Sequence, residues 1–105
     1  MDTKEFISTR LAENTTFKEI CDRYIDEVVP TKKSSEGMTR AIRGICKYIG
    51  DYTVASITPE ILVNYRNERL KSVVGHTVRK DLLRIRRILV VASKEWGVYS
   101  PLGNL

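Results

Sequence analysis

The segment 77-TVRKDLLRIRRIL-89 contains five basic residues and one acid, interleaved with apolar residues at helical spacing. On a helix of about 3.6 residues per turn, Lys80, Arg84 and Arg87 lie together on the side opposite an apolar face. Few acids lie within reach of these cations, and uncompensated like charge destabilises an isolated fold. A row of cations at this spacing suits the phosphates of a nucleic acid. The segment therefore predicts a helix that packs into a core and binds a polyanion.

A second predicted helix repeats the layout. In residues 35–49, Arg40, Arg43 and Lys47 gather opposite an apolar face, and we expect no acid on their side of the helix. His76 and Thr77 stand at the expected start of the 77–96 helix, where free backbone N–H groups and the helix dipole attract a phosphate. For His76, a plain cap or turn residue is an equally open interpretation.

No set of residues predicts catalysis or metal binding. Cys21 and Cys46 each fall on the apolar face of a predicted helix, so we expect two small buried hydrophobes rather than a disulfide. Two cysteines and one histidine far apart in sequence do not predict a zinc site. Tyr24, Tyr48 and Tyr65 lie on apolar faces, which favours packing. We therefore expect no catalytic residue, no metal and no cofactor.

The composition indicates one globular domain. A chain of 105 residues is long enough for one domain and too short for two. With 42% apolar and 30% charged residues, the chain falls outside the disordered class. No apolar run approaches the roughly twenty residues of a membrane span, and the mixed N-terminus is no signal peptide. We therefore expect a cytoplasmic location.

The charge is unevenly distributed along the chain. Residues 1–30 carry four Lys/Arg and seven Asp/Glu, a net −3, whereas residues 31–105 carry fourteen Lys/Arg and six Asp/Glu, a net +8. A basic bulk favours nucleic acid as the partner, with an anionic membrane second. Membrane binding is disfavoured because the apolar faces are too regular and too well matched to one another.

Four apolar periodicities with caps and stops predict helices near 16–29, 35–49, 58–71 and 77–96. Thr16 and Glu19 have capping-box spacing, and Thr58 precedes Pro59 as a cap precedes the first helical residue. In the third helix we expect Leu70 among the inward residues, and at the end of the fourth a largely buried Trp96. No strand pattern appears, so the fold class is all-α, an orthogonal bundle of four or five helices. Residues 1–14 are expected to form an arm or linker, 15–97 the domain, and 98–105 the start of a linker.

Three segments of the sequence resemble a known protein family. The segments 16-TFKEICDRYIDEVVPTKK-33, 48-YIGDYTVASITPEILVNYRNERL-70 and 77-TVRKDLLRIRRILVVASKEWG-97 are similar to the core-binding domain of phage-type integrases, the tyrosine recombinases. The shared pattern is a capped first helix, a Thr-Pro start to the third helix, and a Thr-x-Arg-x-x-Leu helix that ends near Trp-Gly. The resemblance spans residues 16–101 and departs at its end, where Ser100-Pro101 replaces the usual Asn-Pro.

The resemblance implies a SAM-like bundle that forms half of a clamp around double-stranded DNA, with the second and fourth helices facing the duplex. It implies a monomeric isolated domain, and a parent recombinase that is tetrameric on DNA and keeps its catalytic tyrosine in a separate downstream domain. The chain would then be a piece of a longer enzyme, inactive by itself. Carried over by position, the DNA-binding residues are Thr39, Arg40, Arg43, Lys47, His76, Thr77, Arg79, Lys80, Arg84 and Arg87.

Two other interpretations remain open. A helical protein-interaction module would present the same basic faces to an acidic partner surface. A helix-turn-helix regulator would need a tight turn before its recognition helix, and the turn 72-SVVGH-76 fits that requirement only marginally.

Overall fold

The computed structural model describes residues 10–102, and this part of the chain is helical throughout its regular structure. An isolated bridge between Thr16 and Thr53 is the only β-pairing in these residues. The all-α prediction is therefore confirmed. The elements are α2 (Phe17–Glu27), the 3₁₀ turn η1 (Val29–Thr31), α3 (Ser35–Ile49), the 3₁₀ turn η2 (Val54–Ser56), α4 (Pro59–Arg69) and α5 (Gly75–Trp96).

The starts of α2 and α4 and the end of α5 are formed by the residues that the sequence indicated. The Thr16 side chain accepts from the Glu19 N–H at 3.2 Å, and the Thr58 side chain accepts from the Ile61 N–H at 3.4 Å. Each bond satisfies a backbone donor that has no partner inside its helix. Gly97 ends α5 with φ +69°, a left-handed conformation that glycine adopts without steric cost.

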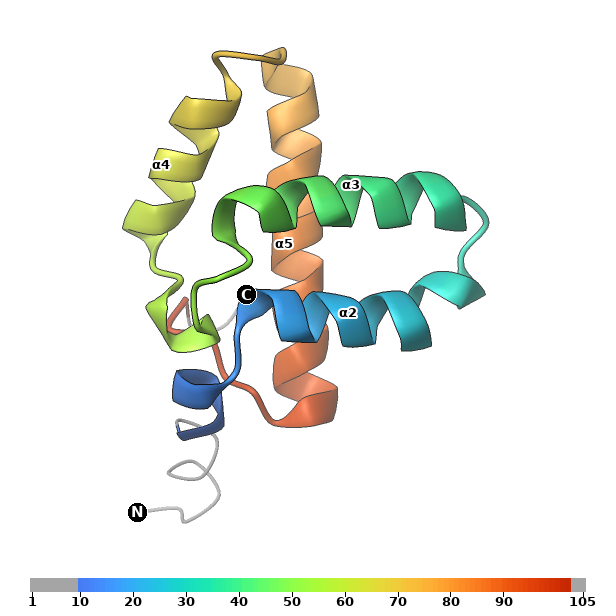
Figure 1. The fold of residues 1–105 in the computed structure, drawn as a ribbon, viewed down its shortest axis with the longest axis vertical. Helices are drawn as coiled ribbons and strands as arrows, with labels where there is room; N and C mark the ends of the chain where they lie inside the picture. Colours follow the sequence, from blue (N-terminus) through green and yellow to red (C-terminus); the bar gives the residue numbers. More distant parts are fainter. Residues whose placement is uncertain (1–9, 103–105) are drawn as a thin grey trace.

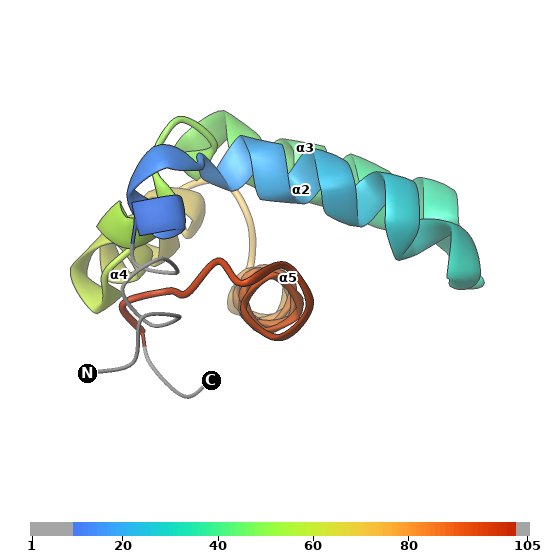
Figure 2. The same cartoon turned by 90° about the horizontal axis from the view of Figure 1, so that it is seen from below.

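The helices cross at a steep angle, as an orthogonal bundle requires. Helices α2 and α3 run antiparallel as one layer, and α5 passes behind both of them nearly at right angles (Figure 1). Helix α4 leads back along α5, so α5 packs against α2, α3 and α4. Viewed along α5, the α2–α3 pair extends well beyond α5 on one side (Figure 2). This overhang creates an inner corner between α5 and the first half of α3.

The core lies where α2, α3 and α5 meet. Its largest fully buried side chains include Phe17 of α2, Ile42 and Ile45 of α3, and Ile85 and Leu89 of α5. Both cysteines are free thiols, Cys21 fully buried and Cys46 partly buried, as expected for small hydrophobic residues.

Three local predictions were wrong in detail. Helix α5 begins at Gly75 rather than Thr77, because the turn after α4 spans residues 70–74 and so lies two residues earlier than the expected turn 72–76. Leu70 follows the end of α4 and is 46% exposed, since it belongs to that turn and not to an inward face. Trp96 is partly rather than largely buried, and the neighbour over its ring is the charged guanidinium of Arg23, 4.6 Å from the ring centroid.

Both ends of the described chain pack on the bundle. Residues 10–14 form a helical turn whose Ala12 is 1% exposed within the core. After α5, Val98 is buried and Leu102 packs against the core, so the segment expected to open a linker begins on the domain surface. The remainder of the predicted arm and linker, residues 1–9 and 103–105, lies outside the described residues.

Membrane-spanning helices and metal-binding clusters are both absent from residues 10–102. No helix in residues 10–102 is long and apolar enough to cross a membrane. No cluster of three or more His, Cys, Asp or Glu side chains in that range has the arrangement of a metal site.

Candidate functional site

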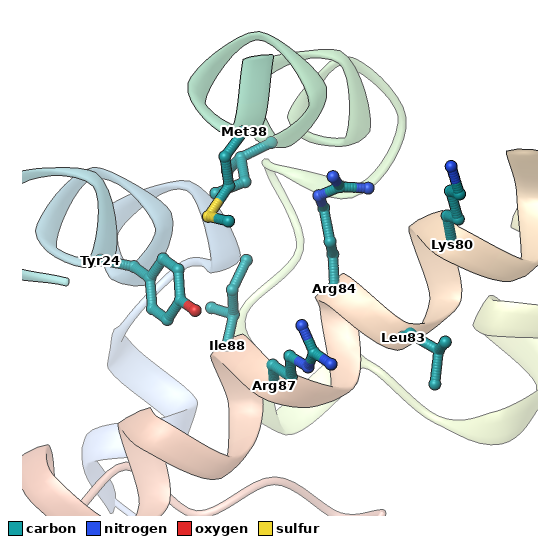
Figure 3. Close-up of a pocket in the computed structure, with 8 residues that line it drawn as sticks. Tyr24, Met38, Lys80, Leu83, Arg84, Arg87 and Ile88 are labelled. Atoms are coloured by element: carbon teal, nitrogen blue, oxygen red, sulfur yellow. The ribbon is translucent and has the colours of Figure 1, made fainter. Parts of the chain in front are cut away.

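A cleft of about 240 Å³ opens at the inner corner between α3 and α5. Its floor is apolar and its wall on α5 is basic, and Figure 3 shows Arg84 reaching from α5 toward α3. The cleft therefore combines a hollow surface with positive charge. Its lining residues are Tyr24, Met38, Ile42, Lys80, Leu83, Arg84, Arg87 and Ile88.

The basic wall follows from the geometry of α5. Lys80, Arg84 and Arg87 are spaced by four and three residues, which places them on one side of the helix. The sequence predicted that this side lies opposite the core face of α5. In the structure it borders the core face instead. The correction matters most for Arg84, which is only partly exposed and whose Nε is buried without a hydrogen-bond partner.

The cleft carries no compensating negative charge. Among residues 10–102, no carboxylate forms an ion pair with Lys80, Arg84 or Arg87. The one acid of the basic segment, Asp81, is turned toward α4 and is 5% exposed. The cations of the cleft are therefore free to meet anions from another molecule.

Asp81 is held by α4 through two hydrogen bonds and an ion pair. Its Oδ2 accepts from Tyr65 Oη at 2.8 Å and from Arg69 Nε at 3.2 Å, and Arg69 Nη2 lies 3.2 Å from the same oxygen as its ion-pair partner. Tyr48 completes the cluster, because its ring meets the Tyr65 ring edge-on and the Arg69 guanidinium lies 5.6 Å from its centroid. Burial, followed by the bond to Asp81, raises the pKa of Tyr65 above its ordinary value. Sequence reasoning missed this cluster, although an acid on the apolar face of a basic helix was a signal for it.

The basic residues of α3 lie around two other hollows. Thr39, Arg40 and Arg43 border one that α3 shares with the end of α2 and with η1, and Arg43 and Lys47 border another beside Asp22. Arg43 Nη1 lies 3.8 Å from Asp22 Oδ1, a pair with both side chains more than half exposed. The expectation of no acid on this side of α3 was wrong, because Glu36 of α3 borders the same hollow as Arg40 and Arg43. Arg43 also has Asp22 of the neighbouring helix beside it. The two basic sets do not share a hollow.

The predicted phosphate site at the start of α5 is altered. Val74 precedes the helix, and no side chain caps it, so neither His76 nor Thr77 has the expected capping role. His76 is exposed and Thr77 is partly buried within the first turn. Arg79 is exposed and does not border the cleft.

A different kind of hollow lies between α4 and α5. It measures about 370 Å³ and is mostly apolar, with Arg66 and Arg86 as its charged lining. Arg86 therefore projects away from the cleft, although it lies next to Arg87 in sequence. Arg66 and Arg86 therefore provide a matched control for the cleft cations.

Comparison with known proteins finds one similar recombinase-related chain. The sequence is 25% identical over 88 residues to a Haemophilus influenzae protein named "Putative integrase/recombinase". The match covers 83% of this chain, and the chain spans 29% of the length of that relative. No family model matches the sequence, and no solved structure matches it significantly.

Proposed function

We propose that this chain is a DNA-binding module of an integrase or recombinase, which contacts duplex DNA through the cleft between α3 and α5. The observation that carries the proposal is a set of three cations, Lys80, Arg84 and Arg87, on one wall of a concave surface, none of which has a carboxylate partner within residues 10–102. The similarity to an integrase/recombinase over most of the chain supports DNA as the polyanion. Recombinase chemistry would belong to parts of the parent protein beyond this domain.

The charge distribution favours contact with the phosphate backbone. Lys80 and Arg87 are exposed and span two turns of α5, so both can reach phosphates along one edge of a duplex. Arg84 lies between them with its stem against the apolar floor, which restricts the positions that its guanidinium can take. On α3, we extend the proposed surface to Thr39, Arg40 and Lys47, with Arg43 contributing less because Asp22 is beside it.

The arrangement of α4 and α5 argues against the helix-turn-helix alternative. Those two helices run in broadly opposite directions as a hairpin (Figure 1), whereas the paired helices of a helix-turn-helix meet at about 90–120°. The interaction-module alternative remains the competitor, and the experiment below separates it from DNA binding.

The test is the salt dependence of binding to a fluorescent duplex, measured by anisotropy. If the cleft cations neutralise about three phosphates, log K should fall against log salt with a slope of about −2.7, and more steeply if α3 also contributes. The double variant Lys80→Gln/Arg87→Gln should reduce the magnitude of that slope by about 1.8. Both residues are exposed, so the variant keeps the fold; Arg84 is left intact because its Nε is buried.

The matched control is Arg66→Gln/Arg86→Gln, which removes the same charge from the opposite hollow. It should change the slope far less than the cleft variant does. Equal effects of the two double variants would mean that DNA senses only net charge and that the cleft is not the interface. Absence of binding by the unaltered chain at low salt would favour the interaction-module alternative.

A further inference from the structure

Cys21 and Cys46 lie opposite each other across the α2–α3 interface. The two helices run antiparallel with a fixed register, because the Lys18 N–H donates to the Gly50 carbonyl at 3.0 Å and Asp22 lies 3.8 Å from Arg43. Between these two contacts, the register pairs position 21 with position 46. Cys21 belongs to the buried core cluster, and Cys46 packs against that cluster from α3.

The two thiols differ in access to solvent. Cys21 is fully buried, whereas Cys46 is partly exposed and borders a hollow of about 310 Å³. That hollow is also lined by the cations Lys18, Arg43 and Lys47 and by the acids Asp22 and Asp51. A small polar oxidant therefore reaches Cys46 first, and Cys21 only through it.

The electrostatic surroundings favour the thiolate of Cys46. The hydrogen bond from the Cys21 thiol lowers the pKa of Cys46, against the effects of burial and of Asp22, and Arg43 and Lys18 lower it further. The same contact, followed by burial, raises the pKa of Cys21. The thiolate is the reactive form of cysteine, so the two residues divide into an attacking and a resolving thiol.

We propose that Cys21 and Cys46 form a reversible, peroxide-dependent disulfide that joins α2 to α3. The Cys46 thiolate attacks one oxygen of hydrogen peroxide, breaking the O–O bond and giving a sulfenic acid and hydroxide. The Cys21 sulfur then attacks the sulfenic sulfur, forming the S–S bond and releasing the second oxygen as water once the Cys21 proton is transferred. In total, two thiols are oxidised and one peroxide is reduced to two waters. A dithiol reductant returns both thiols.

The bond would act on the layer that carries Arg43 and Lys47. It would close a loop that contains the second half of α2, η1 and most of α3, and so restrict opening of the hairpin. The inference rests on the cysteine pair and not on DNA binding, so it stands or falls separately from the proposed function.

The test uses the whole chain, reduced and then exposed to hydrogen peroxide. Free thiols are alkylated under denaturing conditions, and the protein is weighed and digested with trypsin. Cleavage after Lys18, Arg23, Arg43 and Lys47 releases Cys21 in EICDR and Cys46 in GICK. We expect both thiols to become inaccessible to alkylation together, and the oxidised monomer to be about 2 Da lighter than the reduced chain before alkylation. The digest should contain a cross-linked EICDR–GICK peptide that dithiothreitol separates. The oxidised chain should also unfold at a higher temperature than the reduced chain.

Single variants assign the order of reaction. Cys46→Ala should leave Cys21 alkylatable after the same peroxide treatment, because the buried thiol lacks its exposed partner. Cys21→Ala should leave Cys46 as a sulfenic or sulfinic acid, or as an intermolecular disulfide. The Cys46→Ala result is informative even if Cys21→Ala fails to fold, since it leaves the buried position intact. Oxidation of Cys21 in the Cys46→Ala chain, or a wild-type chain whose thiols both survive peroxide or pair only between molecules, would overturn the proposal.

Discussion

Replacing Asp81 with alanine should be among the most destabilising single changes in this domain. The Asp81 side chain is 7% exposed, accepts hydrogen bonds from Tyr65 Oη and Arg69 Nε, and forms an ion pair with Arg69. These bonds join α4 to α5 at a point where neither helix presents an unbroken apolar face. Their loss would leave a buried hydroxyl and a partly buried guanidinium without an acceptor.

The expected magnitude follows from the burial of each partner. Tyr65 is 3% exposed, so its unpaired hydroxyl costs about 1–3 kcal/mol. The Arg69 side chain is 21% exposed, so water can replace part of its interaction with Asp81. Breaking this ion pair should therefore cost about 1–2 kcal/mol, less than the roughly 3–5 kcal/mol for breaking a fully buried pair. We therefore expect Asp81→Ala to lower the free energy of unfolding by about 3 kcal/mol. In a domain of this size, that corresponds to a fall in Tm of roughly 12 °C or more.

Urea unfolding followed by circular dichroism measures the change. Asp81→Asn keeps an oxygen for Tyr65 and should cost about half as much, and Tyr65→Phe should cost about 1 kcal/mol. Because Tyr65 and Asp81 share one bond, the double variant Asp81→Ala/Tyr65→Phe should be less destabilised than the sum of the singles by about 1 kcal/mol. The control Asp26→Ala removes an exposed acid from α2 and should stay within about 0.5 kcal/mol of wild type. A cost below 1 kcal/mol for Asp81→Ala, or strict additivity, would refute the argued role of the cluster.

Three further predictions concern the same bundle. The folded-state pKa of Tyr65 lies above its unfolded value of 10.0, so neutral Tyr65 contributes stability that is complete below pH 10 and is lost as the pH rises above it. Urea unfolding at pH 8 and pH 11 should therefore show a smaller alkaline loss of stability in Tyr65→Phe than in wild type. Trp96→Ala should cost about 2–3 kcal/mol in the same assay, less than a fully buried tryptophan, and a change under 0.5 kcal/mol would contradict its packing on the core. Incubation with a nicked duplex should leave no covalent protein–DNA adduct on a denaturing gel, and a retained band would identify a nucleophilic tyrosine.

The helices were predictable because their signals are local. The Thr16 and Thr58 caps and the Gly97 stop act within one helical turn, and the apolar periodicity of α3 and α5 places their inward residues directly. The predicted helix boundaries were wrong where no local signal, such as a capping side chain, marks the first or last residue of the helix. The start of α5 is an example, because its first residue follows from the closure of the α4–α5 turn and not from a capping side chain.

The candidate site was less predictable because it depends on contacts between helices. A helical projection assigns Lys80, Arg84 and Arg87 to one side but cannot say that α3 crosses beside them and half-buries Arg84. The Arg43–Asp22 pair has the same origin, since it joins residues 21 positions apart that only the α2–α3 packing brings together. Sequence periodicity describes one helix at a time, so it cannot report which partner a charged side chain meets.

The position of Asp81 explains how one helix can serve both the core and a polyanion. Asp81 stands three residues before Arg84, the spacing at which an acid and a base on one helix commonly pair. In the structure its carboxylate instead accepts from Tyr65 and Arg69 of α4, and Arg84 is left without an acidic partner among residues 10–102. The acid is thus used to fix α4 against α5, while the charge that it would have neutralised stays in the cleft. Under the proposed function, the α4 cluster leaves the charge of Arg84 available to a phosphate.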